Sequence, residues 1–216
     1  MTIYMLVLCG LLVLNFMLGK KHFKLFLIIS TIAMSVLAYH LVVFEAADLY
    51  RYLNIMDLCR EMGWDWVNKY YGPQNPLSIA FFYGISLFND DGMLPAIAAA
   101  ITYGFSFAIL YKASKKTGST FNELTIAYWF FMLNMNFLYV TTVIRFYVAF
   151  SIMAYFLYMD IIEKKRRPLC FAIYITLCFF HYAMLVFVLL RFVFIFSRKM
   201  KGTLAALGTV FVPLVL

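Results

Sequence analysis

Charged side chains are scarce in this sequence. Asp, Glu, Lys and Arg make up only 13% of the 216 residues, whereas 65% are hydrophobic. A soluble globular domain is roughly a quarter charged and half apolar. A soluble core of this size would not hide so much apolar surface, so the composition excludes an ordinary soluble enzyme or binding domain.

The signatures of common soluble enzymes and metal sites are also missing. The sequence contains no Walker loop, no GxGxxG, no HExxH and no GxSxG. Its four cysteines form no CxxC pair, and its three histidines are scattered along the chain. We therefore expect no disulfide framework, no metal site and no cofactor.

Long apolar runs are present instead. The runs 25–44 and 94–110 are apolar around the whole helical circumference, and a helix needs about 20 such residues to cross a bilayer. A transmembrane β-barrel would show alternating polar and apolar residues. The runs predict an all-α fold, namely a polytopic transmembrane helical bundle with about six to eight membrane segments.

Most basic residues occur in four short clusters between the apolar runs. A net charge of +8 is compatible with nucleic-acid binding, but such binding needs one continuous basic face, so we expect no nucleic-acid partner. Short cationic loops remain in the cytoplasm because their translocation costs free energy. The clusters hold 13 of the 18 Lys and Arg residues and are Lys20, Lys21 and Lys24; Lys112, Lys115 and Lys116; Lys164, Lys165, Arg166 and Arg167; Arg198, Lys199 and Lys201.

The clusters set the expected direction of each helix. No positive segment precedes the first apolar run, so it is a retained helix that starts outside. The chain then alternates in and out, and the multi-pass protein lies in the bacterial inner membrane with its basic loops in the cytoplasm. The expected helices are 2–18, 25–44, 93–111, 120–140, which begins with the capping box Thr120 to Glu123, and 143–162.

Two regions do not fit a simple crossing. Residues 45–92 are expected outside. Of these, 45–76 form a surface loop, and the apolar segment 77–88 that follows is too short to span and is interfacial or re-entrant. Residues 168–197 form either a broken or tilted hairpin with His181 near its tip, or one full span followed by an amphipathic segment. The apolar end of the chain suggests that 1–216 is one membrane domain at the N-terminal side of a longer protein.

Some ionisable residues are left over after the basic loops are assigned, and most of them lie on the expected outer side. Arg145 is the strongest candidate for a functional residue, because an ionisable group at membrane depth is costly and is therefore taken as functional by default. Alternatively, its side chain reaches the outer headgroups or pairs with a loop carboxylate. Asp48 shares a helical face with Glu45 and with Arg51, which suits a general base beside a cation, or simply a solvated helix end. His181 is either reactive or a hydrogen-bonded packing residue.

Three short stretches resemble the EpsG-type branch of the Wzy-like polysaccharide polymerases. They are Asp48-Leu49-Tyr50-Arg51-Tyr52, similar to an acidic-x-x-Arg-Tyr segment; Val143-Ile144-Arg145-Phe146-Tyr147-Val148-Ala149, similar to Ile-Arg-x-x-x-Ala; and Phe179-Phe180-His181-Tyr182-Ala183, similar to Phe-His-x-x-Ala. Asn75-Pro76-Leu77 also stands where an acidic-Pro-Leu is common. The order and spacing of these stretches carry the resemblance.

The resemblance implies a membrane glycosyltransferase of the GT-C type that polymerises lipid-linked repeat units for exopolysaccharide, capsule or O-antigen. Its donor is an undecaprenyl-pyrophosphate-linked oligosaccharide at the outer face, and its surroundings are the lipid bilayer and other polysaccharide assembly proteins. The implied roles are pyrophosphate binding by Arg145 and Arg51 and a base or acceptor-positioning role for Asp48 or Glu45. His181 would act as an acid, a base or a hydrogen-bonding group. The aromatic residues Trp64, Trp66, Tyr70 and Tyr71 would stack on sugars or anchor the chain at the interface.

Two other functions remain open at this point: a transporter or flippase of lipid-linked sugars, and a noncatalytic scaffold. A transporter places polar groups through the bilayer midplane and shows internal repeats, whereas the unexplained charges gather near one face. A scaffold would tolerate loss of Arg145 or of His181.

Overall fold

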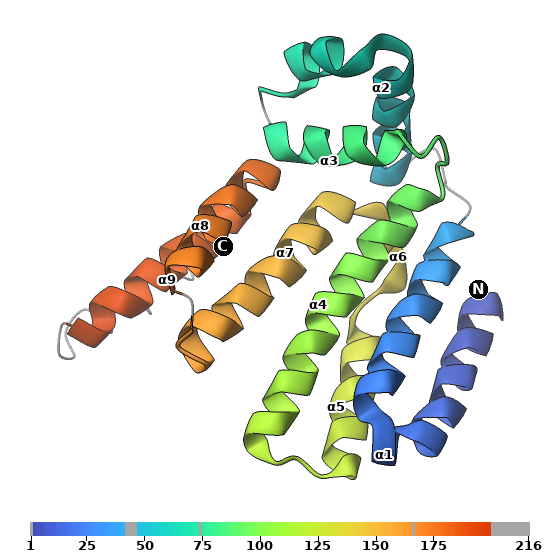
Figure 1. The fold of residues 1–216 in the computed structure, drawn as a ribbon, viewed down its shortest axis with the longest axis vertical. Helices are drawn as coiled ribbons and strands as arrows, with labels where there is room; N and C mark the ends of the chain where they lie inside the picture. The colour runs from blue at the N-terminus through green and yellow to red at the C-terminus, as the bar shows by residue number, and fades with distance from the viewer. Residues whose placement is uncertain (1, 42–46, 74, 166, 200–216) are drawn as a thin grey trace.

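The computed structural model describes residues 2–41, 47–73, 75–165 and 167–199, and within these ranges the protein is helical without any strand (Figure 1). The all-α prediction is therefore confirmed. Among the described residues, three helical segments are long and apolar enough to cross a membrane, namely Lys21–Tyr39, Met93–Thr117 and Ile144–Ile162. The elements are α1 (Thr2–Tyr39), α2 (Asp48–Tyr71), α3 (Pro76–Ser86), α4 (Met93–Thr117), α5 (Phe121–Asn134), α6 (Phe137–Thr142), α7 (Ile144–Leu157), the π-helical turn η1 (Tyr158–Ile162), α8 (Arg167–Phe180) and α9 (Met184–Lys199).

Helix α1 consists of two arms that meet at His22. There the backbone leaves the helical region, with φ −131° and ψ 46°, and the second arm returns beside the first (Figure 1). The sequence predicted two helices here, 2–18 and 25–44, separated by a basic turn. The two helices and the turn are confirmed, although the second arm ends earlier, at Tyr39.

Helix α4 lies in the middle of the bundle and contributes to two hydrophobic cores. The first core also contains α1, α5 and α6, and the second contains α2, α3, α7, α8 and α9. Ala98 and Ala99 of α4 are fully buried, one in each core. Since a small side chain lets neighbouring backbones approach closely, these alanines allow α4 to pack against both α1 and α7.

The predicted helix 120–140 is present but broken. The expected capping box forms: the Thr120 hydroxyl accepts a hydrogen bond from the Glu123 N–H, and the Glu123 carboxylate accepts one from the Thr120 N–H at 2.7 Å. Helix α5 then ends at Asn134, and the Asn136 side chain caps α6 by accepting the Leu138 N–H at 3.0 Å. Asn136 thus begins a new helix instead of continuing α5, because its side chain forms a hydrogen bond with a nearby backbone N–H.

The polar stretch that was expected to be a surface loop is mostly helical. Helix α2 runs from Asp48 to Tyr71, with one break at Gly63, where φ is 77°. The segment is therefore not a loop but a separate helix, since α1 ends at Tyr39 and α2 begins at Asp48. The prediction was wrong because it weighed polar content above periodicity. The apolar face at helical spacing consists of Leu49, Tyr52, Met56 and Cys59, all buried.

Helices α2 and α3 form a cap across one end of the bundle (Figure 1). Arg60 of α2 holds this cap to the turn before α4: its guanidinium lies 2.8 Å from an Asp91 carboxylate oxygen and 2.7 Å from one of Asp57, and its Nε donates to the Ser86 carbonyl at 3.3 Å. Asp90 and Asp91 lie in this turn, where the Asp90 carboxylate accepts the Gly92 N–H at 2.9 Å.

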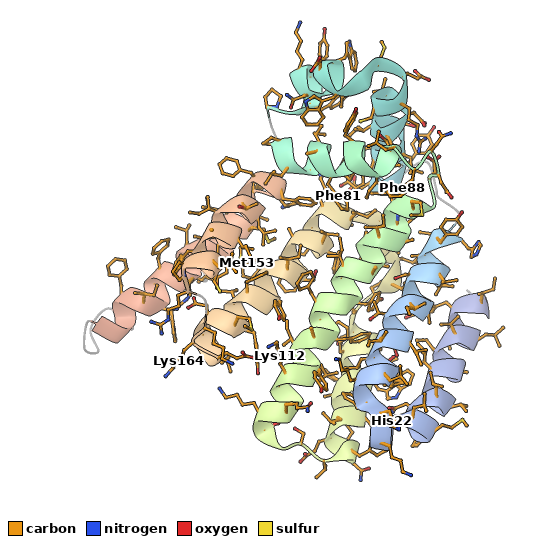
Figure 2. The ribbon with its side chains drawn as sticks, viewed as in Figure 1. His22, Phe81, Phe88, Lys112, Met153 and Lys164 are labelled. Carbon is orange, nitrogen blue, oxygen red and sulfur yellow. The ribbon has the colours of Figure 1, made fainter. Side chains whose placement is uncertain are left out.

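The described parts of the first three basic clusters lie at the end opposite the cap. His22, Lys112 and Lys164 are all found there, whereas Phe81 and Phe88 lie at the cap end (Figure 2). Lys112 pairs with Glu163 at 3.0 Å, which joins the ends of α4 and η1. The grouping of these described clusters at one end is what the basic-loop interpretation of the sequence requires.

Helices α8 and α9 form a hairpin with His181 in the connecting turn. This is the first of the two alternatives left open for residues 168–197. Both helices present a wide apolar face, and their buried apolar residues pack in the core with α7. These residues are Cys170, Tyr174, Leu177, Phe180, Met184 and Val188.

Candidate functional site

The site lies where α2, the first turn of α7 and the turn between α8 and α9 meet beneath the cap. Arg145 of α7 donates a hydrogen bond from Nε to the hydroxyl of Tyr52 at 3.2 Å, across 93 residues of sequence. Its guanidinium carbon is 5.3 Å from the centroid of the Tyr52 ring, within the range of a cation–π interaction. Arg145 is half-buried, so these two contacts hold its side chain in place while part of it stays accessible.

Tyr52 is the residue that positions Arg145, and sequence reasoning gave it no role of its own. Its side chain is only 5% exposed and stacks on Phe82 of α3, with 4.9 Å between ring centroids. Burial raises the pKa of the Tyr52 phenol, an effect that the neighbouring Arg145 only partly offsets. The phenol therefore stays protonated, and its O–H remains a donor while its oxygen accepts from Arg145.

His181 is also near Arg145. Burial lowers the pKa of the His181 imidazole, and the positive charge of Arg145 lowers it further. The ring meets Phe146 edge-on at 5.7 Å. His181 thus packs against Phe146 and lies within reach of the Arg145 charge. Its reactivity stays a prediction.

The backbone around His181 selects its tautomer. Nδ1 accepts a hydrogen bond from the Ala183 N–H at 3.2 Å, so in the neutral ring the proton is on Nε2. Because the lowered pKa keeps the ring neutral near neutral pH, Nε2–H is a hydrogen-bond donor. The geometry thus favours the hydrogen-bonding role over that of a general base.

Asp48 and Arg51 lie on the first turn of α2, close to Tyr52. Arg51 pairs with Asp48 at 3.4 Å, with 77% and 43% of the two side chains exposed, so the internal ion pair expected from the spacing is confirmed. The Asp48 charge also acts on Tyr52 and raises its pKa. Asp48 is therefore an accessible carboxylate that pairs with Arg51 and lies close to Tyr52, the residue that holds Arg145. Glu45, the other predicted acid, lies outside the described residues.

The four predicted glycan-binding aromatics are on the second half of α2, beyond the break at Gly63. Trp64 packs edge-on against Tyr83 of α3 at 5.3 Å, which makes it part of the cap. Trp66 lies 4.5 Å from Tyr70, and Tyr70 and Tyr71 are 59% and 39% exposed. None of the hydrogen bonds or ion pairs of these described side chains joins them to Arg145 or His181.

A second ionic cluster, at the other end of α7, was not predicted as a site. Asp160 in η1 is fully buried and pairs with Arg191 of α9 at 2.6 Å; Tyr174 of α8 donates to the same carboxylate oxygen at 3.4 Å. The exposed Arg167 approaches the other oxygen at 3.7 Å. The signal available in the sequence is that Asp160 and Arg191 are each a charged residue within an apolar run.

No protein-family model matches the chain, and no curated protein and no solved structure is significantly similar to it. The geometry of the site and the three short motifs therefore carry the functional argument.

Proposed function

We propose that this protein is a membrane glycosyltransferase that polymerises lipid-linked oligosaccharide repeat units in exopolysaccharide, capsule or O-antigen assembly. One observation carries the proposal. The three stretches that resemble the EpsG-type polymerases are far apart in sequence, yet Tyr52, Arg145 and His181, one from each, lie together beneath the cap. Hydrogen bonding, charge and burial connect them.

The chemistry needs three groups, and the site supplies each. A hydroxyl of the acceptor sugar attacks the anomeric carbon of the donor, the bond from that carbon to the pyrophosphate oxygen breaks, and undecaprenyl pyrophosphate leaves with the bonding electrons. Asp48 accepts the hydroxyl proton as general base. Arg145 and Arg51 hold the departing pyrophosphate, because a guanidinium matches phosphate oxygens in a bidentate way. His181 donates Nε2–H to a sugar or phosphate oxygen.

The proposed placement has the α2–α3 cap at the outer face and the basic end in the cytoplasm. The three long apolar segments cross the bilayer, and the shorter apolar helices complete the GT-C-like bundle of about six to eight membrane segments. The separation of the cap from the lysine-rich end supports this orientation. Placed this way, the site lies at the level of the outer headgroups, where a lipid-linked pyrophosphate lies.

The orientation is tested by labelling single cysteines in a variant that lacks the four native ones. Residues 48, 90 and 182 are expected to react with a membrane-impermeant maleimide in intact cells, and residue 164 only after the cells are opened, because the cap and the basic end face opposite sides. Residue 118, in the exposed turn after α4, is a second control for the basic side. Labelling of 48 only in opened cells would overturn the orientation.

The function is tested by complementing a polymer-deficient strain with Asp48→Asn. We expect polymer to fall by about 10²- to 10⁴-fold, because a general base contributes roughly that factor, while the amount of protein in the membrane is unchanged. Asp65→Asn is the matched control, since Asp65 is an exposed acid on the same helix. Long polymer at normal levels in the Asp48 variant would remove the base assignment and favour the scaffold.

The tautomer of His181 predicts a pH profile. As pH falls past the ordinary histidine value, about 6.5, His181 stays neutral because its pKa is lowered, so activity is expected to persist there. At still lower pH, protonated Nδ1 no longer accepts the Ala183 N–H, and the turn and the activity are lost together. Initial polymerisation rates in vesicles between pH 4.5 and 8 measure this loss of activity at low pH, which is the acid limb of the profile.

A pair of His181 variants separates the turn from the chemistry. In His181→Asn, the amide oxygen replaces Nδ1 as the acceptor for the Ala183 N–H, as in an ordinary Asx turn, so the fold is kept. The Nε2 donor is lost, and so is the part of the activity loss at low pH that comes from protonation of His181; the part that comes from protonation of the proposed base Asp48 remains. His40→Asn, at an exposed histidine, is the control. Full activity in His181→Asn, with the acid limb unchanged, would exclude a role for the imidazole.

A further inference from the structure

A pocket of about 700 Å³ opens at the basic end, between the bend of α1, the end of α4 and the start of α5. Lys21 and Lys24 contribute from α1 and Lys115 from α4, and all three are exposed. Among the residues that line it there is no carboxylate. Each lysine is therefore available to an anion from outside the chain.

The pocket forms where α1 bends and α4 ends. α1 bends at His22, and α4 ends at Gly118, which is left-handed with φ 67°. The bend and the helix end thus bring lysines from sequence positions more than 90 apart to one concave surface. Ser114 and Ser119 add hydroxyls to its wall.

One side of the pocket continues as an apolar stripe along the second arm of α1. Leu25 and Ile28 line the pocket and are each 47% exposed; Ile32 and Val36 follow at helical spacing and are 57% and 54% exposed. These four side chains share one face of the helix. A cationic pocket that runs directly into an exposed apolar stripe matches a molecule with an anionic head and a hydrocarbon tail.

We propose that this pocket binds an anionic phospholipid of the cytoplasmic leaflet, with its phosphate between Lys21, Lys24 and Lys115 and an acyl chain along Leu25, Ile28 and Ile32. Basic pockets between helices on the cytoplasmic side bind lipid headgroups in this way. The inference rests on the proposed membrane orientation and not on glycosyl transfer. The bound lipid would join α1 to α4 at the basic end of the bundle, opposite the candidate functional site.

The test measures binding of dioctanoyl phosphatidylglycerol to the purified full chain by native mass spectrometry. The triple variant Lys21→Gln, Lys24→Gln, Lys115→Gln is expected to bind it on the order of 100-fold more weakly, since each lysine near an anionic surface contributes roughly a fivefold factor. The matched control replaces Lys116, Lys164 and Lys165 with glutamine, which removes the same charge from the same end but outside this pocket. Equal losses in the two triples would show nonspecific attraction and overturn the proposal.

Two further arms distinguish a lipid from a soluble phosphate. Ile28→Ser is expected to weaken the phospholipid several-fold while leaving binding of the deacylated headgroup, glycerophosphoglycerol, unchanged. If the headgroup or inorganic phosphate binds as tightly as the lipid, the pocket is a soluble-anion site and the proposal fails. Because none of these measurements involves polymer, loss of the glycosyltransferase proposal would leave the result intact, and loss of lipid binding would leave the polymerase assays intact.

Discussion

Arg145→Lys is expected to reduce polymer formation by about 10²- to 10³-fold, the usual cost of removing one donor that stabilises charge in a transition state. Lysine keeps the positive charge but offers a single ammonium where the guanidinium presents a planar fork. It also loses the geometry in which Nε donates to the Tyr52 hydroxyl while the rest of the fork faces the substrate. The substitution thus distinguishes the effect of the positive charge at residue 145 from the effect of bidentate hydrogen bonding by the guanidinium.

The measurement is polymer length and amount on gels, normalised to membrane protein, in the complemented strain. Arg167→Lys is the matched control: it is the same substitution on an exposed arginine at the basic end of the bundle, and polymer is expected to remain within about twofold, as for most surface changes. Normal polymer in the Arg145→Lys strain would show that Arg145 serves the fold or the membrane interface and would remove it from the chemistry.

Asp160→Asn is expected to destabilise the protein by about 3–5 kcal/mol, because it leaves the Arg191 guanidinium buried without its counter-ion. The loss is expected to be large because the pair is buried: the Asp160 and Arg191 side chains are 0% and 7% exposed, and their charged atoms lie 2.6 Å apart. For a chain of this length, such a change lowers the melting temperature by roughly 10 °C. Thermal unfolding in detergent, followed by circular dichroism and by aggregation, measures it.

The double variant Asp160→Asn, Arg191→Met decides whether the loss comes from the stranded charge. Replacing both partners removes the unpaired cation, and more than half of the lost stability is expected to return. Asp65→Asn again serves as the exposed control, with a change within about 0.5 kcal/mol. If the double variant is less stable than Asp160→Asn, the pair is a net attraction that stabilises the fold, and the stranded-charge explanation is wrong.

Parts of the candidate site were accessible from sequence and parts were not. Arg145, Asp48 and His181 stood out because each is a polar group that neither the basic clusters nor a turn explains. Tyr52 did not, since one tyrosine among 16 carries no mark of its contact with Arg145. Asp160 was missed for a related reason: its partner Arg191 is 31 residues away, and no local spacing rule links two residues on different helices.

The sequence by itself determined the features that depend on near neighbours. Helicity follows from the long apolar runs, the start of α5 from Thr120 and Glu123, and the bends at the basic clusters from where those runs stop. Each is decided within a few residues, where backbone hydrogen bonding and hydrophobicity outweigh distant contacts.

Only the tertiary structure decided which polar groups meet. The buried face of α2 turned an apparent loop into a helix, and packing of that helix over α7 placed Tyr52 on Arg145. The same packing of α7 with α8 and α9 enclosed Asp160 with Arg191. The physical reason is that the free energy of a charge depends on burial and on partners within a few ångströms, and both are set by how the helices pack rather than by any one segment.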